Sequence, residues 1–201
     1  MPTRLYATTV FFLHPRQPSM TSTKRPVDLF YAVFLAIHLP MTLAVDLQSL
    51  YPQHLIPEPL KELLRFWISI SNDPILQGGG SGSPLWAWAR SFLALEAVGQ
   101  IPIFIFGAYG LYKGSRSVQV PLLVYGVSAA TTTFACLATV LALPVHAPPF
   151  PPPLTGALAL SPEQRTILLG AYTPYLIIPL LIACDMAGRL SRRGYLHEKM
   201  L

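Results

Sequence analysis

Four long apolar runs constrain the fold of this chain more than any other feature of its sequence. A helix needs about 20 mostly apolar residues to cross the hydrocarbon core of a bilayer. Runs of about that length occupy residues 28–46, 87–112, 119–143 and 166–187. Hydrophobic residues make up 52% of the chain and charged residues only 11%, where a soluble domain carries roughly a quarter charged residues. We therefore predict an all-α membrane protein, a bundle of four transmembrane helices.

The distribution of Lys and Arg predicts how this bundle is oriented. Ten of the 14 lie in the N-terminal tail, between the second and third runs, or after the fourth run. This bias predicts that both termini are cytosolic. The expected divisions are a disordered basic tail at 1–24, a membrane domain at 25–190 and a cytosolic tail at 191–201. No basic stripe with interleaved aromatic residues indicates nucleic-acid binding.

The connection between the first two runs is long enough to contain structure of its own. Pro57 and nearby acidic residues form a helix-entry pattern, and the apolar residues that follow recur at helical spacing. We predict a short amphipathic helix on the membrane surface. The Gly- and Ser-rich segment at 77–84 predicts a flexible linker, and the proline run at 148–153 an extended connection.

Prolines interrupt three of the apolar runs, at Pro40, Pro102, Pro174 and Pro179. A proline inside a helix removes a backbone hydrogen bond and bends the helix, which membrane bundles tolerate. We expect Pro40, Pro102 and Pro174 to have this structural role. Bent helices splay apart, and the space between them predicts a cavity within the membrane.

Two carboxylates, Asp46 and Glu96, stand where the pattern predicts lipid. An ionisable group at that depth usually marks a functional site. At 1.5 Å per residue, Asp46 lies about 27 Å along the first helix and Glu96 roughly 14 Å into the antiparallel second one, so both fall in the lumenal half. Close carboxylates do not both ionise cheaply, so we expect one to hold a proton. Two alternatives stay open: Asp46 at a wetted interface, and a purely structural Glu96.

Other polar residues of the runs are candidates for the same site. Thr42 and Gln100 lie one helical turn from the two carboxylates, and Tyr172, Tyr175 and Thr131 add hydroxyls from the third and fourth runs. His38 is expected to be a packed, hydrogen-bonded residue, and no second metal ligand stands at a suitable spacing. We expect no metal and no cofactor.

Several motifs resemble the sigma-2 receptor branch of the EXPERA-domain membrane proteins, including their fungal relatives associated with efficient mitochondrial targeting. The resemblance runs in order from about residue 25 to residue 193. Its motifs are Arg25-Pro-Val-Asp28, His38-Leu-Pro-Met-Thr-Leu-Ala-Val-Asp-Leu-Gln48, Asn72-Asp-Pro-Ile-Leu76, Leu95-Glu-Ala-Val-Gly-Gln-Ile-Pro102, Tyr112-Lys-Gly-Ser115 and Ala171-Tyr-Thr-Pro-Tyr-Leu-Ile-Ile-Pro179.

The resemblance implies a multi-pass endoplasmic-reticulum protein, often a homodimer, that binds sterols or lipophilic amines. It implies that Asp46 and Glu96 form the ligand site, with Asp46 pairing with the ligand ammonium. It places Asp73 at an acid needed for ligand binding, and for this Asp-Pro pair we expect a structural role in ordering the loop. It also implies a link to sterol homeostasis or to the targeting of mitochondrial precursors.

Related sterol Δ8–Δ7 isomerases share the domain, and isomerase activity is the alternative function. Moving a double bond by protonation and deprotonation needs two positioned acid–base groups. The His-x-x-x-Glu pairing that the isomerases have within a span is not found in the spans of this chain, since Phe92 precedes Glu96 by four residues and Thr42 follows His38 by four. The sequence therefore favours a binding protein over an enzyme.

Overall fold

The computed structural model describes residues 25–145 and 159–199. The expected tail at 1–24 and the proline run at 148–153 lie outside the described residues. The helices are α1 (Pro26–Ala44), α2 (Glu58–Ser71), α3 (Pro74–Gly80), α4 (Ala87–Leu95), α5 (Ile101–Tyr112), α6 (Gln119–Ala142) and α7 (Pro162–Glu198). Short 3-10 segments cover Asp46–Leu50 (η1), Gln53–Leu55 (η2) and Pro84–Trp86 (η3), and a π-helical segment, η4, covers Glu96–Gln100.

Four helical stretches are long and apolar enough to cross a membrane, which confirms the predicted fold class. They are Pro26–Leu50, Pro84–Tyr112, Gln119–Ala142 and Pro162–Arg192. Large apolar side chains on their outer faces are exposed, among them Val98, Phe106 and Phe134. Such faces are costly in water, whereas lipid chains solvate them as well as another helix would.

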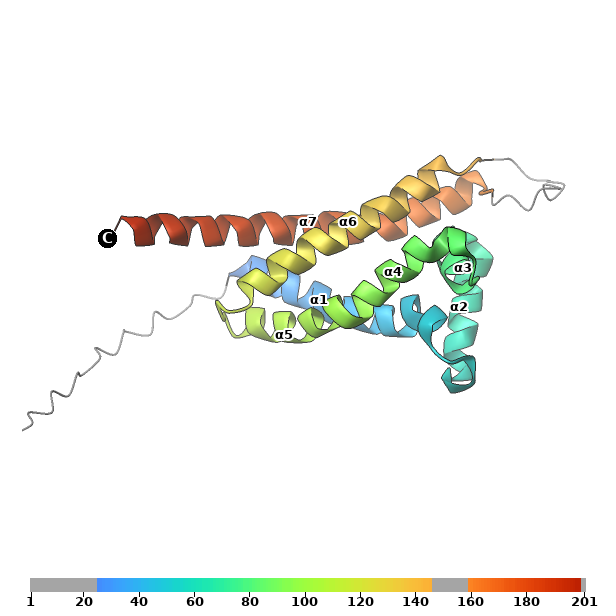
Figure 1. The fold of residues 1–201 in the computed structure, drawn as a ribbon, viewed down its shortest axis with the longest axis horizontal. Helices are drawn as coiled ribbons and strands as arrows, with labels where there is room; N and C mark the ends of the chain where they lie inside the picture. Colours follow the sequence, from blue (N-terminus) through green and yellow to red (C-terminus); the bar gives the residue numbers. More distant parts are fainter. Residues whose placement is uncertain (1–24, 146–158, 200–201) are drawn as a thin grey trace, which may run out of the picture.

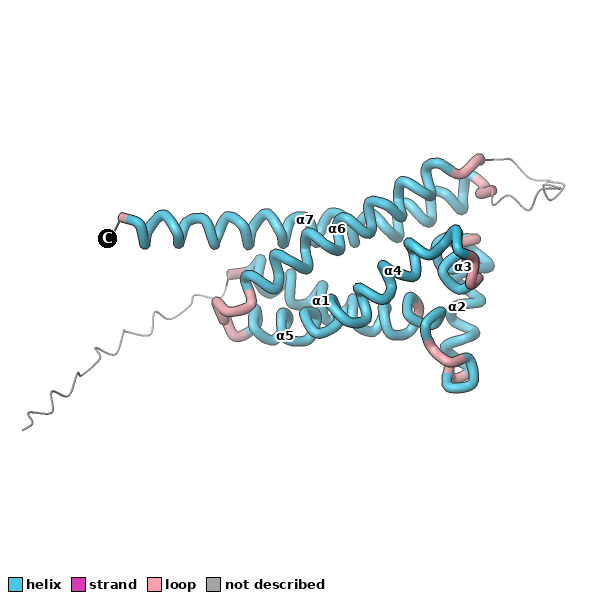
Figure 2. The backbone as a smooth tube through the Cα atoms, in the orientation of Figure 1, coloured by secondary structure: helices cyan, strands magenta, loops and turns pink. Residues whose placement is uncertain are grey.

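The spans pack as two closely contacting helix pairs, α6 with α7 and α1 with α5 (Figure 1). The start of α1, the connection between α5 and α6, and the end of α7 lie at one end of the bundle, while α2 and α3 lie at the other (Figure 2). Among the described basic residues, Arg25, Arg116 and Arg189 therefore lie at the first end, and Lys61 and Arg65 of α2 lie at the other.

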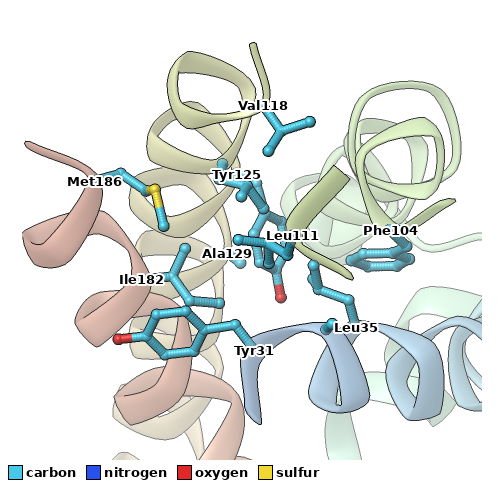
Figure 3. Packing of buried hydrophobic residues seen from close by; sticks show 11 residues of the cluster. Tyr31, Leu35, Phe104, Leu111, Val118, Tyr125, Ala129, Ile182 and Met186 are labelled. Atoms are coloured by element: carbon cyan, nitrogen blue, oxygen red, sulfur yellow. The ribbon is translucent and has the colours of Figure 1, made fainter. Parts of the chain in front are cut away.

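The main core lies where α1, α5, α6 and α7 meet. Leu35, Leu122, Tyr125 and Ile182 are completely buried in it. The ring of Tyr125 extends from α6 into the space between α1 and α5, and its hydroxyl points toward α1 (Figure 3). The core therefore brings one polar atom deep into the bundle, and the candidate site begins there.

Helices α6 and α7 pack closely against each other at Gly126. A Cβ added at this residue would lie 2.5 Å from the carbonyl oxygen of Pro179 and 2.8 Å from the amide nitrogen of Ala183. Small residues allow membrane helices to pack this closely. Any larger side chain at Gly126 would force the two helices apart.

The prolines affect their helices in two ways. Pro40 lies inside α1, and Pro174 and Pro179 lie inside α7, where the helix continues through both residues. Pro102 instead stands at the second residue of α5, directly after η4, where the amide of Ile101 donates to the carbonyl of Glu96. Pro102 lacks an amide proton, so the wider π-turn falls where the regular α-helical ladder is already broken.

The predicted amphipathic helix is present as α2, and it has two apolar faces. Trp67 and Ile68 on one face are half-buried toward the protein, and α2 contacts α7. Leu63, Phe66 and Ile70 on the second face are exposed. An exposed apolar face beside charged residues is typical of a helix at the membrane interface.

The prediction of a flexible linker at 77–84 is wrong for its first half. Residues 77–80 form the end of α3, and the indole of Trp86 packs so closely on Gly78 that a Cβ there would lie 2.0 Å from the ring. Glycine is disfavoured in helices because of its backbone entropy. Here the close contact with Trp86 overrides that preference.

Candidate functional site

Glu96 is held by residues of α1 rather than by neighbours on its own span. Its Oε1 accepts a hydrogen bond of 2.6 Å from the hydroxyl of Thr42, which is completely buried. The Nε2 of His38, one turn before Thr42, lies 3.7 Å from the same oxygen. Thr42 and His38, the two neighbours of the Glu96 carboxylate, therefore lie on one face of α1.

His38 connects this carboxylate to the rest of the bundle. Its Nδ1 lies 3.2 Å from the hydroxyl of Tyr125 on α6, and its ring centroid lies 4.6 Å from that of Phe104 and 4.5 Å from that of Tyr175. The imidazole is buried. His38 is thus packed and hydrogen-bonded as expected, but it also stands beside Glu96, which the sequence spacing did not indicate.

Asp46 begins η1, directly beyond the end of α1, and its side chain is half-buried. It lies close enough to Glu96 and Asp73 for the charges to interact. The two carboxylates that the sequence singled out therefore lie within range of electrostatic interaction. Within the described part of the chain, no side chain or amide donates a hydrogen bond to the Asp46 carboxylate.

Asp73 is the best-satisfied carboxylate of the group. It caps α3 by accepting from the amides of Ile75 and Leu76 at 2.9 and 3.2 Å. The indole of Trp67 donates to it at 3.1 Å, and the hydroxyl of Tyr172 lies 3.0 and 3.2 Å from its two oxygens. Together these contacts join α2, α3 and α7 through one buried side chain.

The remaining candidate residues divide between the site and its surroundings. Tyr172 contacts Asp73, and Tyr175 packs on His38 as described. Gln100 is buried and donates from its Nε2 to the hydroxyl of Ser128 at 3.5 Å. It therefore connects η4 to α6, and no hydrogen bond joins it to either candidate carboxylate in the described structure.

Thr131 does not join the site, which corrects the sequence analysis. Its side chain is exposed, and its hydroxyl donates to the carbonyl of Val127 on its own helix at 2.8 Å. The polar residue of α6 that does face η4 is Ser128, three positions earlier. The rotation of α6 relative to the neighbouring helices determines which of its polar residues faces η4. This rotation cannot be predicted from the sequence of α6 alone.

Two contributors to the site were missed by sequence reasoning. Nothing in the sequence indicated that Tyr125 would contact His38, because a tyrosine in an apolar run is usually interpreted as a core residue. The π-helical segment η4 was weakly indicated by the sequence, since Glu96 stands six residues before Pro102 and π-turns often occur at functional sites.

The arrangement suits the binding of a cation with a large apolar body. A half-buried carboxylate without a hydrogen-bond donor attracts positive charge strongly when water is excluded. The aromatic rings around His38 offer apolar contacts next to Glu96. Among residues 25–145 and 159–199, no three His, Cys, Asp or Glu side chains gather closely enough to hold a metal ion.

Comparison with known proteins shows to which family the chain belongs. The profile of the EXPERA (EXPanded EBP) superfamily matches residues 59–186. "Sigma intracellular receptor 2" of Homo sapiens is 32% identical over 169 residues, which cover 82% of this chain and 89% of the receptor, and the Macaca fascicularis protein of that name gives the same values. "Efficient mitochondria targeting-associated protein 19" of Schizosaccharomyces pombe is 29% identical over 191 residues, covering 94% of this chain and 86% of the yeast protein. The chain is therefore a multi-pass membrane protein that belongs to the EXPERA superfamily.

Proposed function

We propose that this protein binds sterols or lipophilic amines within the membrane, and that Asp46 and Glu96 hold the polar end of the ligand. The observation that carries the proposal is the Asp46 carboxylate, which lies close enough to Glu96 and Asp73 for their charges to interact and receives no hydrogen bond from the described residues. An ammonium group would supply both the missing positive charge and the missing donor.

Glu96 has a different part in this proposal. Thr42 already donates to it, so its capacity for a further partner is smaller than that of Asp46. We assign Glu96 to positioning and to accepting a second hydrogen bond from a ligand ammonium or a sterol hydroxyl. Similarity to proteins named sigma intracellular receptor 2 supports a ligand-binding role.

The proposal is tested by binding of N-benzyl-4-phenylpiperidine, a lipophilic tertiary amine, to the purified full-length protein. Its carbon analogue, 1-benzyl-4-phenylcyclohexane, has a similar apolar body and no charge. We expect saturable binding of the amine and at least about tenfold weaker binding of the carbon analogue, since charged hydrogen bonds contribute about 1.5–3 kcal/mol.

The matched variants are Asp46→Asn and Glu62→Gln. Both replace a carboxylate by an amide, but Glu62 lies on the exposed face of α2, where it pairs with Arg65. Amine binding should be lost in Asp46→Asn and retained in Glu62→Gln. Retained amine affinity in a stably folded Asp46→Asn protein would remove the basis of the proposal.

The cellular role that we propose is in the endoplasmic-reticulum membrane, in sterol homeostasis or in the targeting of mitochondrial precursors. The name of the yeast relative supports the second of these. Deletion of the gene, followed by measurement of precursor import and of sterol distribution, separates the two. Rescue of the affected process by wild-type protein but not by Asp46→Asn would connect the role to the site.

The distance between His38 and Glu96 favours one further candidate, a sterol Δ8–Δ7 isomerase. An imidazole and a carboxyl group 3.7 Å apart provide two groups able to give a proton to one carbon and take one from another. Incubation of the purified protein with a Δ8-sterol should then yield the Δ7-sterol, and Glu96→Gln should abolish the product. No product above a protein-free blank would exclude this candidate for the sterol used.

A further inference from the structure

A second polar site lies at the other end of α1 from Asp46. A cavity of about 160 Å³ opens where α1 begins, where α5 ends and where α6 begins, and α7 passes beside it. Its polar lining includes Arg25, Asp28, Arg116, Gln119 and Arg189. None of these residues takes part in the candidate ligand site, so the cavity needs an account of its own.

The charges around this cavity do not balance. Arg189 donates to both Asp28 and Asp185, and a guanidinium nitrogen of Arg25 lies 3.6 Å from Asp185. These contacts pair two carboxylates with two guanidinium groups. Arg116 lines the same cavity and has no ion pair within the described chain. The cavity therefore has an excess positive charge.

Two buried polar atoms beside the cavity have no hydrogen-bond partner. Gln119 is 8% exposed, and its Oε1 is buried without a donor; the Nε of Arg189 is buried without an acceptor. Buried polar groups are nearly always satisfied, so each exception calls for an explanation. A ligand that carries both an acceptor for Arg189 and a donor for Gln119 would satisfy both atoms.

The position of the cavity restricts the source of such a ligand. It lies at the ends of the spans Pro26–Leu50, Pro84–Tyr112 and Gln119–Ala142, and the span Pro162–Arg192 passes at the same level. The ends of transmembrane helices lie at the depth of lipid headgroups. Basic pockets between helices at this level are suited to anionic headgroups.

We propose that this cavity binds the phosphate diester headgroup of an anionic phospholipid whose polar group carries hydroxyl donors. Arg116 and the free Nε of Arg189 would donate to the phosphate oxygens, and a headgroup hydroxyl would donate to Oε1 of Gln119. Guanidinium groups are the side chains best suited to phosphate oxygens. The excess of basic residues at this end predicts that the lipid comes from the cytosolic leaflet, where anionic lipids gather.

The test is a titration of the purified full-length protein, in neutral detergent, with dioctanoyl phosphatidylglycerol. Dioctanoyl phosphatidylcholine is the first control, because it contains the same phosphate diester but has no net charge and no hydrogen-bond donor. Inorganic phosphate is the second control and separates a lipid site from a site for the free ion. Binding is measured by isothermal titration calorimetry.

Two variants and one matched control locate the binding. Arg116→Ala removes the guanidinium without an ion pair, and Gln119→Leu removes the unsatisfied acceptor. Lys113→Ala removes an equal charge from the same connection, where Lys113 lies over the ring of Tyr109 and outside the cavity lining. Gln119→Leu should not lower the melting temperature without lipid, because it removes a buried atom that has no partner.

We expect saturable binding of phosphatidylglycerol, weakened about tenfold in Arg116→Ala and in Gln119→Leu and unchanged in Lys113→Ala. Phosphatidylcholine and inorganic phosphate should show no saturable binding. Equal affinity for the two lipids would overturn the proposal, as would equal effects of Arg116→Ala and Lys113→Ala. If inorganic phosphate binds as tightly as phosphatidylglycerol, the site is one for a free anion and the lipid proposal is wrong.

Discussion

His38 and Glu96 come from different spans, yet Nε2 of the imidazole lies 3.7 Å from Oε1 of the carboxylate. Thr42, one turn further along α1, donates to the same oxygen. One face of α1 therefore supplies the immediate neighbours of the only acidic residue that interrupts the second apolar run. The candidate site is a property of the contact between α1 and the second span, rather than of either helix alone.

The hydrogen bond from Thr42 to Glu96 predicts a stability effect that can be isolated by an isosteric change. Thr42→Val keeps the shape of the side chain and removes the donor. The free energy of unfolding should fall by about 1–3 kcal/mol, because a buried carboxylate oxygen loses its partner. Thermal unfolding of the purified protein measures the effect as a lower melting temperature.

Thr131→Val is the matched control for this change. Thr131 is exposed on α6 and donates only to its own helix, so its replacement should change the free energy of unfolding by no more than about 0.5 kcal/mol. Equal melting temperatures for the two variants would show that the Thr42 hydroxyl does not support Glu96.

The sequence predicts those features of the structure that depend on residues close together along the chain. The spans follow from local hydropathy, and the start of α2 follows from Pro57 and the acidic residues after it. The proximity of Asp46 and Glu96 follows from simple counting along antiparallel helices. These features need no knowledge of how one helix is rotated against another.

The features that sequence reasoning missed depend on that rotation. Whether His38 faces Glu96, and whether Ser128 or Thr131 faces η4, is decided by the register between helices. Gly126 is an example. Because α7 packs closely on α6 at this residue, the rotation of α6 about its axis is restricted, and so are the directions in which its other faces point. No His-x-x-x-Glu pairing lies within any of the four apolar runs, but His38, which comes from another helix, lies 3.7 Å from the Glu96 carboxylate.

The contact at Gly126 predicts a second stability effect. Gly126→Ala places a Cβ within 2.5 Å of the Pro179 carbonyl oxygen, and overpacking of this kind costs about 1–3 kcal/mol. The melting temperature should fall. The matched control is Gly170→Ala on α7, where a new Cβ meets nothing within 4 Å.

Gly170→Ala should instead raise the free energy of unfolding by about 0.5–1 kcal/mol, since alanine is the better helix former. Opposite shifts in melting temperature are therefore expected from the same chemical change in two neighbouring helices. A stabilising effect of Gly126→Ala would contradict the close packing of α6 on α7.

The four donors around Asp73 predict that this residue acts on the fold of the connection rather than on the ligand. Asp73→Ala removes the cap of α3 and leaves Trp67 and Tyr172 without their acceptor. We expect the free energy of unfolding to fall by about 2 kcal/mol or more. Tyr172→Phe removes only one donor and should cost less.

Ligand binding distinguishes this structural role from direct contact. When membranes that contain the Asp73→Ala protein are titrated with radiolabelled N-benzyl-4-phenylpiperidine, the number of binding sites should fall while their affinity stays nearly unchanged, because fewer molecules are folded. A full number of sites with strongly reduced affinity would instead place Asp73 in contact with the ligand.

We propose above all that Asp46 holds the positive charge of a ligand inside the membrane. The most direct measurement is an experimental structure of the purified protein with bound N-benzyl-4-phenylpiperidine. We predict that the amine nitrogen lies within about 2.7–3.2 Å of an Asp46 carboxylate oxygen, with the rings of the ligand near His38 and Tyr175. An amine nitrogen bound out of contact with Asp46 would show that this carboxylate does not hold the ligand's charge.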